Sequence, residues 1–266
     1  MPVDNPYWLF GNKLRNVIKM SYAASAFSSR FDEIPLEERE LIKNRLSEFY
    51  YIGVRDEVTK SFVESLELGI TVYLNHDPTI FLQPATDVKI AKMTLRKNFV
   101  FNNKESVSFM TRELPKIDKL RGELAEQYNL LHFYRRDRYK ADLLDNRCRF
   151  MNNVSPYEWY NLYGQMKLNI TNFFHGACLG IINHVPTIVV DDFEQSYMSK
   201  YAQLMTDLKL TDRLFYKKDF QYEKFIEAVN YCLTHREEES QRLAIAIDKE
   251  RVKSQSFFLA LDNILK

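Results

Sequence analysis

A junction between a strand and a helix is predicted at Leu168-Asn169-Ile170-Thr171-Asn172-Phe173-Phe174-His175-Gly176-Ala177, in the second half of the chain. Its apolar run stops at a polar Thr-Asn step, and a histidine follows where a helix is expected to begin. Pro186 then precedes Thr187-Ile188-Val189-Val190, which is typical of a second buried strand. Open α/β sheets hold ligands at such a junction, because strand carboxyl ends and helix N-termini meet there. His175 is therefore the first candidate for a functional residue.

Strand and helix patterns alternate along the rest of the chain. Runs rich in aromatic and β-branched residues predict strands at 18–24, 49–54, 70–74, 106–111 and 130–134. Apolar residues at helical spacing predict helices at 35–49, 57–66, 115–128, 155–165, 196–208, 219–234 and 237–265. Ser155-Pro156-Tyr157-Glu158 has the pattern of a capping box, which fixes the start of one of these helices.

This alternation predicts an α/β fold with two Rossmann-like parallel-sheet domains. The pattern blurs in the polar stretch 85–104, which we expect to be the crossing between the domains. Residues 1–95 would then form a partial N-terminal domain and residues 96–236 a C-terminal domain. Residues 237–266 would form a C-terminal helix that packs back on the first domain.

Composition sets modest limits on function. The chain has 266 residues, and 45% of them are hydrophobic, which is typical of a folded protein. Its 37 Lys and Arg against 36 Asp and Glu give a net charge of +1, which does not favour nucleic acid as a partner. The three cysteines and the histidines lack metal-ligand spacing, so no metal is expected. With no apolar run near the ~20 residues of a membrane span, we expect a cytoplasmic protein, and peripheral membrane contact stays open.

Charged residues follow several of the expected strands. Because ligands bind outside strand carboxyl ends, we ranked the residues at these positions: Arg55 with Asp56, Asp77, Arg112 with Glu113, His175, and Asp191 with Asp192. Two arginines and a histidine on converging edges would suit a small anion. The alternatives are structural: a surface ion pair for Arg55, a capping or packing role for His175, and a solvated helix face for Lys200.

Several strings, in order and spacing, resemble the polysaccharide pyruvyl transferase family. They are Tyr51-Ile52-Gly53-Val54-Arg55-Asp56-Glu57, Asp77-Pro78-Thr79-Ile80-Phe81-Leu82, Thr171-Asn172-Phe173-Phe174-His175-Gly176 and Val185-Pro186. Ser21 to Ser25, Ser155 to Trp159 and Ser199-Lys200 also fall in order, so the resemblance covers nearly the whole chain. It implies a GT-B-like fold and transfer of a pyruvyl group from phosphoenolpyruvate to sugar hydroxyls as a ketal, during cell-surface polysaccharide synthesis.

The resemblance also implies roles for particular residues. His175 would act as the acid or bind phosphate, and Arg55 would clamp the donor anion, with Arg112 as the second choice. Glu57 or Asp56 would take the proton of the incoming hydroxyl. Substrate contacts are further expected from Asn172, Gly176 and Lys200. Phosphoenolpyruvate is then a substrate, no cofactor is expected, and the acceptor is a sugar or a lipid-linked saccharide.

The chain departs from the family at two places. Family members usually begin with a glycine- and asparagine-rich strand and loop, whereas nothing similar precedes Ser21, so we expect an incomplete first domain. Many members carry an arginine where this chain has Phe173. Two other functions therefore stay open: a GT-B glycosyltransferase that uses a nucleotide-sugar donor, and a non-catalytic member of the family. The oligomeric state leaves no trace in the sequence.

Overall fold

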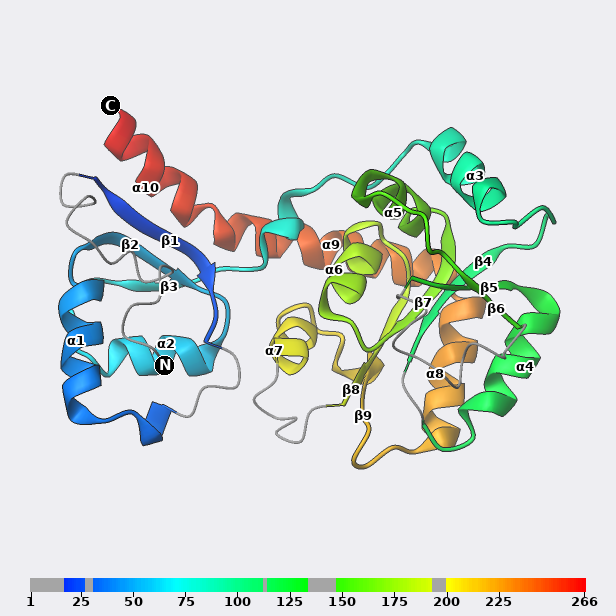
Figure 1. The fold of residues 1–266 in the computed structure, drawn as a ribbon, viewed down its shortest axis with the longest axis horizontal. Helices are drawn as coiled ribbons and strands as arrows, with labels where there is room; N and C mark the ends of the chain where they lie inside the picture. The colour runs from blue at the N-terminus through cyan, green and yellow to red at the C-terminus, as the bar shows by residue number, and fades with distance from the viewer. Residues whose placement is uncertain (1–16, 27–30, 112–113, 134–146, 193–199) are drawn as a thin grey trace. The chain divides into compact units, whose positions relative to one another are not determined.

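The computed structural model describes residues 17–26, 31–111, 114–133, 147–192 and 200–266 (Figure 1). The chain divides into two compact units, each with its own sheet. Unit 1 holds Met1–Pro78 and Glu250–Lys266, and unit 2 holds Thr79–Lys249. The boundary therefore falls before residue 79, ahead of the expected boundary at residue 95. The last 17 residues of the chain join unit 1.

Unit 1 is built on a three-stranded parallel sheet with the order β1-β2-β3. Its elements are β1 (Lys19–Ala24), the 3-10 helix η3 (Phe31–Glu33), α1 (Leu36–Leu46), β2 (Phe49–Val54), α2 (Glu57–Glu64), β3 (Val72–Leu74) and α10 (Ser256–Leu265). On one face, Ile52 packs with Phe62 of α2 in an apolar core. On the other, the Tyr51 ring lies 5.4 Å from the Phe257 ring of α10 and its hydroxyl is 2.9 Å from Ser256 Oγ. The strand predicted at 49–54 is confirmed.

Unit 2 is built on a six-stranded parallel sheet with the order β6-β5-β4-β7-β8-β9. Its strands are β4 (Ser106–Met110), β5 (Asn129–His132), β6 (Cys148–Phe150), β7 (Met166–Thr171), β8 (Thr187–Asp191) and β9 (Leu214–Tyr216). Its helices are η4 (Pro78–Phe81), α3 (Val88–Lys97), α4 (Ile117–Gln127), α5 (Pro156–Tyr163), α6 (Phe174–Ile182), α7 (Lys200–Asp207), η8 (Thr211–Arg213), α8 (Tyr222–Thr234) and most of α9 (Arg236–Ser254). The strand-helix-strand unit predicted around His175 is confirmed as β7, α6 and β8.

Helices cover both faces of the unit 2 sheet. α4 and α8 pack on one face around Phe109, Ile170 and Phe225. On the other face α6, α7 and α9 form one cluster, and α3 and α5 form a second. Both faces of β4, β7 and β8 are therefore buried, which explains why these strands read as continuous apolar runs. None of the described helices is long and apolar enough to cross a membrane.

Residues 85–104 are not a plain linker, contrary to the sequence-based expectation. They contain α3, which Asp87 caps by accepting from the Ile90 N–H at 2.9 Å. Only Ala91 and Thr94 are fully buried along this helix, and one of them is polar. The fully buried side of this helix holds an alanine and a threonine, with no large apolar residue, which is why the sequence suggested a crossing.

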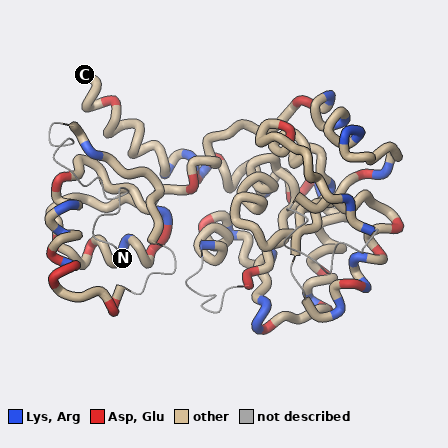
Figure 2. The backbone as a smooth tube through the Cα atoms, in the orientation of Figure 1, with Lys and Arg blue, Asp and Glu red and all other residues tan. Residues whose placement is uncertain are grey.

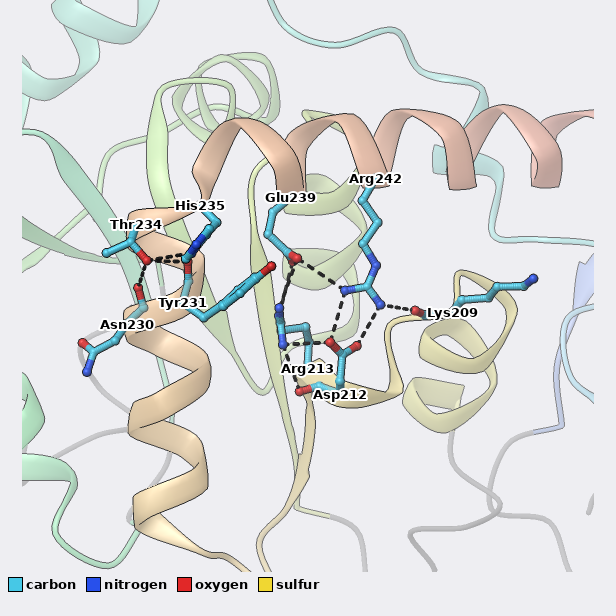
Figure 3. A network of polar contacts seen from close by, with 9 residues as sticks. All are labelled: Lys209, Asp212, Arg213, Asn230, Tyr231, Thr234, His235, Glu239 and Arg242. Carbon is cyan, nitrogen blue, oxygen red and sulfur yellow. Dashed lines mark hydrogen bonds and ion pairs between the residues drawn. The ribbon is translucent and has the colours of Figure 1, made fainter.

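A polar network fixes the start of α9 to the segment before β9 (Figure 3). Glu239 of α9 is almost fully buried and accepts from Arg213 through both oxygens, at 3.1 Å and 3.3 Å. The exposed side of the network holds Asp212, which pairs with Arg213 at 2.8 Å and with Arg242 at 2.9 Å. The Arg213 guanidinium also lies 4.9 Å from the Tyr231 ring centroid. The ion pairs and the contact of Arg213 with the Tyr231 ring therefore hold η8, α8 and α9 against one another.

Candidate functional site

The carboxyl edge of the unit 2 sheet contains the point where the strand order reverses. From β4 the chain continues to β5 and β6 on one side, and from β7 it continues to β8 and β9 on the other. The connections at this point leave in opposite directions, and doubly wound sheets bind their ligands there. The Asn172 N–H donates to the Met110 carbonyl at 2.8 Å, so the β4–β7 ladder is intact up to this edge.

The turn from β7 into α6 is tight. The Thr171 hydroxyl accepts from the Phe173 N–H at 3.0 Å, and Phe173 is extended as the residue before the helix. A Cβ on Gly176 would lie 3.0 Å from both Thr171 Oγ1 and the Tyr163 hydroxyl. Glycine at this position thus lets the first turn of α6 pack closely on the end of β7. Its expected contact with substrate stays a prediction.

Two polar side chains flank Phe174 at the start of α6. His175 is exposed in the first helical turn, and its ring lies 5.7 Å from the Phe174 ring. Lys200, the first residue of α7, has its ammonium 5.0 Å from the Phe174 ring centroid. The Tyr201 hydroxyl donates to the Asn172 carbonyl at 2.6 Å, which ties α7 to this turn. Asn172, His175, Gly176 and Lys200, four of the predicted site residues, therefore lie together.

The same edge holds buried polar atoms that lack partners in the described part of the chain. The Asn172 amide donates through Nδ2 to Asp192 at 3.3 Å, but its Oδ1 accepts no hydrogen bond. The hydroxyl of Thr111, which follows β4, has no partner among the described residues either. Each such atom costs about 1–3 kcal/mol, so this edge is suited to a ligand with hydrogen-bond donors. The sequence pointed to Thr111 only through its place at the end of a strand.

Arg55, Asp56, Glu57 and Asp77 belong to unit 1. Arg55 follows β2, and its Nη1 donates to the buried Asp77 at 2.8 Å. The Arg55–Asp77 ion pair is partly buried, with 21% and 7% of the two side chains exposed. Asp56 is the N-cap of α2 and accepts from the Thr59 N–H at 2.8 Å, while Glu57 is exposed. A cleft shared by Arg55 and His175 stays a prediction, since the two residues belong to different units.

Arg112 lies outside the described residues. Among the residues that the structure describes, no three His, Cys, Asp or Glu side chains are grouped so that they could hold a metal ion. The chemistry that the described edge of unit 2 offers is therefore that of an exposed imidazole, an ammonium and the N–H groups of a helix start, which together suit an anion.

Comparisons with known proteins bear on the family through the sequence and on the fold through the structure. A model described as polysaccharide pyruvyl transferase matches residues 3–192. Among solved structures, a UDP-forming α,α-trehalose-phosphate synthase from Burkholderia xenovorans is 13% identical, with a TM-score of 0.54 over 93% of this chain and 68% of its own. HepE of Anabaena in complex with UDP-glucose is 14% identical, with a TM-score of 0.51 over 87% of this chain and 69% of its own. A glycosyltransferase from Rickettsia africae is 15% identical, with a TM-score of 0.53 over 87% of this chain and 66% of its own.

No curated protein sequence matches the chain. The solved structures are similar in fold alone, because their sequence identity is low. Their fold is of the GT-B type with Rossmann-like parallel sheets, and the two parallel sheets of this chain correspond to that architecture.

Proposed function

The chain belongs to the polysaccharide pyruvyl transferase family, and from this we propose that it transfers a pyruvyl group from phosphoenolpyruvate to sugar hydroxyls. The product is a ketal on a cell-surface polysaccharide or on its lipid-linked precursor. One observation supports this proposal most strongly: the exposed imidazole of His175 and the ammonium of Lys200 flank the first turn of α6 at the point where the sheet order reverses.

Phosphoenolpyruvate suits this edge because it carries a phosphate and a carboxylate. The first N–H groups of α6 lack partners within the helix and carry partial positive charge, which favours an anion. Lys200 adds a full positive charge next to them. We assign the donor phosphate to this helix start. Arg55, with Arg112 as the second choice, binds the other anionic group, since a guanidinium matches a carboxylate or a phosphate with two hydrogen bonds. Asp77 fixes the orientation of Arg55.

The reaction needs an acid on the enol carbon of the donor. His175 donates a proton to the methylene carbon, and the central carbon becomes oxocarbenium-like. A sugar hydroxyl forms a bond to that carbon and loses its proton, for which Glu57 is the proposed base. The carbon–oxygen bond to phosphate then breaks, and the bonding electrons leave with the phosphate. A second hydroxyl adds and loses its proton, so one proton ends on the methyl group and one on phosphate.

A second reading, a glycosyltransferase with a nucleotide-sugar donor, has its own support. Ionised phosphoenolpyruvate has no hydrogen-bond donor, so its oxygens accept from the Thr111 hydroxyl but leave Asn172 Oδ1 without a partner. A sugar hydroxyl donates to Asn172 Oδ1. In the pyruvyl transferase reading that hydroxyl belongs to the acceptor sugar. In the second reading it belongs to the sugar of the donor, and the structurally similar HepE is in complex with such a nucleotide sugar, UDP-glucose. A third reading is a non-catalytic member of the family.

Direct binding and turnover separate the three readings. We expect calorimetry to detect phosphoenolpyruvate binding, and NMR to detect phosphate release and a ketal methyl signal when sugar acceptors are added. His175→Gln should lower kcat by about 100-fold to 10,000-fold, the usual contribution of an acid in the transition state. His235→Gln is the matched control, because His235 is also exposed but contacts Thr234 and Tyr231 at the end of α8.

Binding of UDP-glucose that depends on His175, without binding of phosphoenolpyruvate, would support the glycosyltransferase reading instead. A folded protein that binds neither donor would support the non-catalytic reading.

A further inference from the structure

Helix α3 of unit 2 presents a basic outer face. Ala91 and Thr94 point into the unit, whereas Lys89, Lys92 and Arg96 lie on the opposite, exposed side. Figure 2 shows Lys and Arg repeated along α3. Within the described part of the chain, no ion pair joins these three cations to a carboxylate. By contrast, Lys97 at the edge of the same helix pairs with Glu158 at 3.0 Å.

Large apolar side chains lie next to these cations. Met93 is 60% exposed among them, and Phe99 and Phe101 just beyond the helix are 75% and 72% exposed. The two phenyl rings contact each other edge to face, with centroids 6.4 Å apart. We call Lys89, Lys92, Met93, Arg96, Phe99 and Phe101 the α3 surface. Such exposed aromatic groups beside unpaired cations indicate a binding surface.

The end of α3 holds Phe99 outward at an energetic cost. The Val100 N–H donates to the Leu95 carbonyl at 2.9 Å and the Phe99 N–H donates to the Arg96 carbonyl at 3.0 Å, which is a Schellman ending. Phe99 occupies the left-handed position of this ending, with φ of +63°. Glycine is usual there because a Cβ is strained in that conformation. His184 and Lys209 occupy the same left-handed position at two other helix ends, so what sets Phe99 apart is that 75% of its side chain is exposed.

We propose that the α3 surface docks on an anionic lipid bilayer. Unpaired cations beside exposed Phe and Met side chains match the chemistry of the bilayer interface, where lipid head groups carry negative charge and the acyl boundary accepts rings. Charge complementarity is local, because the whole chain has a net charge of only +1. Peripheral docking also places the protein where lipid-linked saccharides are found, although the inference does not depend on the identity of the donor.

Co-flotation of the full chain with vesicles tests this surface. We expect the protein to float with vesicles of phosphatidylcholine and phosphatidylglycerol, and not with phosphatidylcholine alone. The triple variant Lys89→Gln, Lys92→Gln, Arg96→Gln should lower the partition coefficient by about 100-fold, since each cation near an anionic surface contributes about five-fold. The control triple is Lys218→Gln, Lys224→Gln, Lys249→Gln, which removes the same charge from exposed lysines on other elements. It should change partitioning less than about two-fold.

Two further variants separate docking from folding. Phe99→Gly with Phe101→Ser should lower partitioning by about ten-fold or more while the thermal midpoint does not fall, since glycine relieves the left-handed strain. In Phe99→Trp made in a Trp8→Phe, Trp159→Phe background, emission should shift to the blue and be quenched by brominated lipid. The proposal is overturned if wild type fails to float, if the two triple variants act alike, or if the Phe99→Trp emission is unchanged on vesicles. Binding to single-stranded DNA, or dimers that depend on the phenyl rings, without vesicle binding would also overturn it.

Discussion

Replacing Glu239 by Gln should destabilise unit 2 more than any exposed change of the same charge. Glu239 and Arg213 have only 4% and 9% of their side chains exposed, and they share two hydrogen bonds. Glutamine keeps the size and part of the hydrogen bonding of the carboxylate but removes its charge. The Arg213 guanidinium, which cannot lose its proton, then stays buried without its main counter-ion.

The size of the effect follows from what compensates Arg213 in the variant. Removing one partner of a fully buried pair costs about 3–5 kcal/mol. Asp212 still pairs with Arg213 at 2.8 Å, but its side chain is 49% exposed, so solvent screens it. Burial alone would raise the pKa of Asp212, yet Arg242 and Arg213 outweigh it and lower the pKa, so Asp212 stays ionised. We therefore expect a loss of about 2–3 kcal/mol, or roughly 4–12 °C in the thermal midpoint.

Urea unfolding measures this loss. In a Trp8→Phe background the remaining tryptophan, Trp159, lies in α5 and reports on unit 2. Glu237→Gln is the control, because it removes a charge from the same first turn of α9 but from an exposed side chain, and it should cost less than about 0.5 kcal/mol. Arg213→Met in the Glu239→Gln background should recover most of the loss. If the two glutamine variants have equal stability, or if the double variant is the least stable, the reasoning about the buried charge is wrong.

Two other predictions concern the core of unit 2. Gly180→Ala should cost about 1–3 kcal/mol of stability in thermal unfolding, because a Cβ would lie 2.4 Å from Asn169 Nδ2 and 2.5 Å from Thr187 Oγ1. Gly122→Ala is the control and should cost nothing, because its Cβ would meet one arginine side chain at 3.5 Å. Equal thermal midpoints of the two variants would contradict this prediction. Burial and a nearby arginine lower the pKa of His132 to about 4. As the pH drops, the unfolded chain therefore protonates this histidine before the folded chain does. The free energy of unfolding should fall between pH about 6.5 and 4, by up to about 1.4 kcal/mol per pH unit. His132→Asn should lose this slope in pH-dependent urea unfolding, and an unchanged slope would assign it to other groups.

Local patterns predicted much of the fold. The capping box is present, with the Glu158 N–H donating to Ser155 Oγ at 3.2 Å and the Ser155 N–H donating to Glu158 at 2.8 Å. The β7–α6–β8 unit was also predicted, because buried parallel strands are continuous apolar runs. Each of these features depends on residues within a few positions of one another. Helix α3 was missed, since its fully buried positions are one alanine and one threonine.

The site was harder to predict because it depends on distant contacts. The position of His175 followed from the strand-to-helix step, but the approach of Lys200 to Phe174 depends on how α7 returns to the sheet. Arg55 stands beside two acidic residues in the sequence, yet its partner is Asp77 at the end of another strand. The parallel register that brings β2 and β3 together decides this pairing, and no local pattern encodes that register.

The docking of α10 on β2 has a consequence for how the protein is made. Ribosomes deliver the chain from its N-terminus, so β1, β2 and β3 emerge long before Phe257 does. Until synthesis reaches that residue, the Tyr51 face of the sheet lacks its covering helix. Unit 2 has all of its strands available earlier, so we expect its sheet to form before the sheet of unit 1 is covered. A released chain that ends at residue 249 should therefore hold a folded unit 2 and bind chaperones through unit 1.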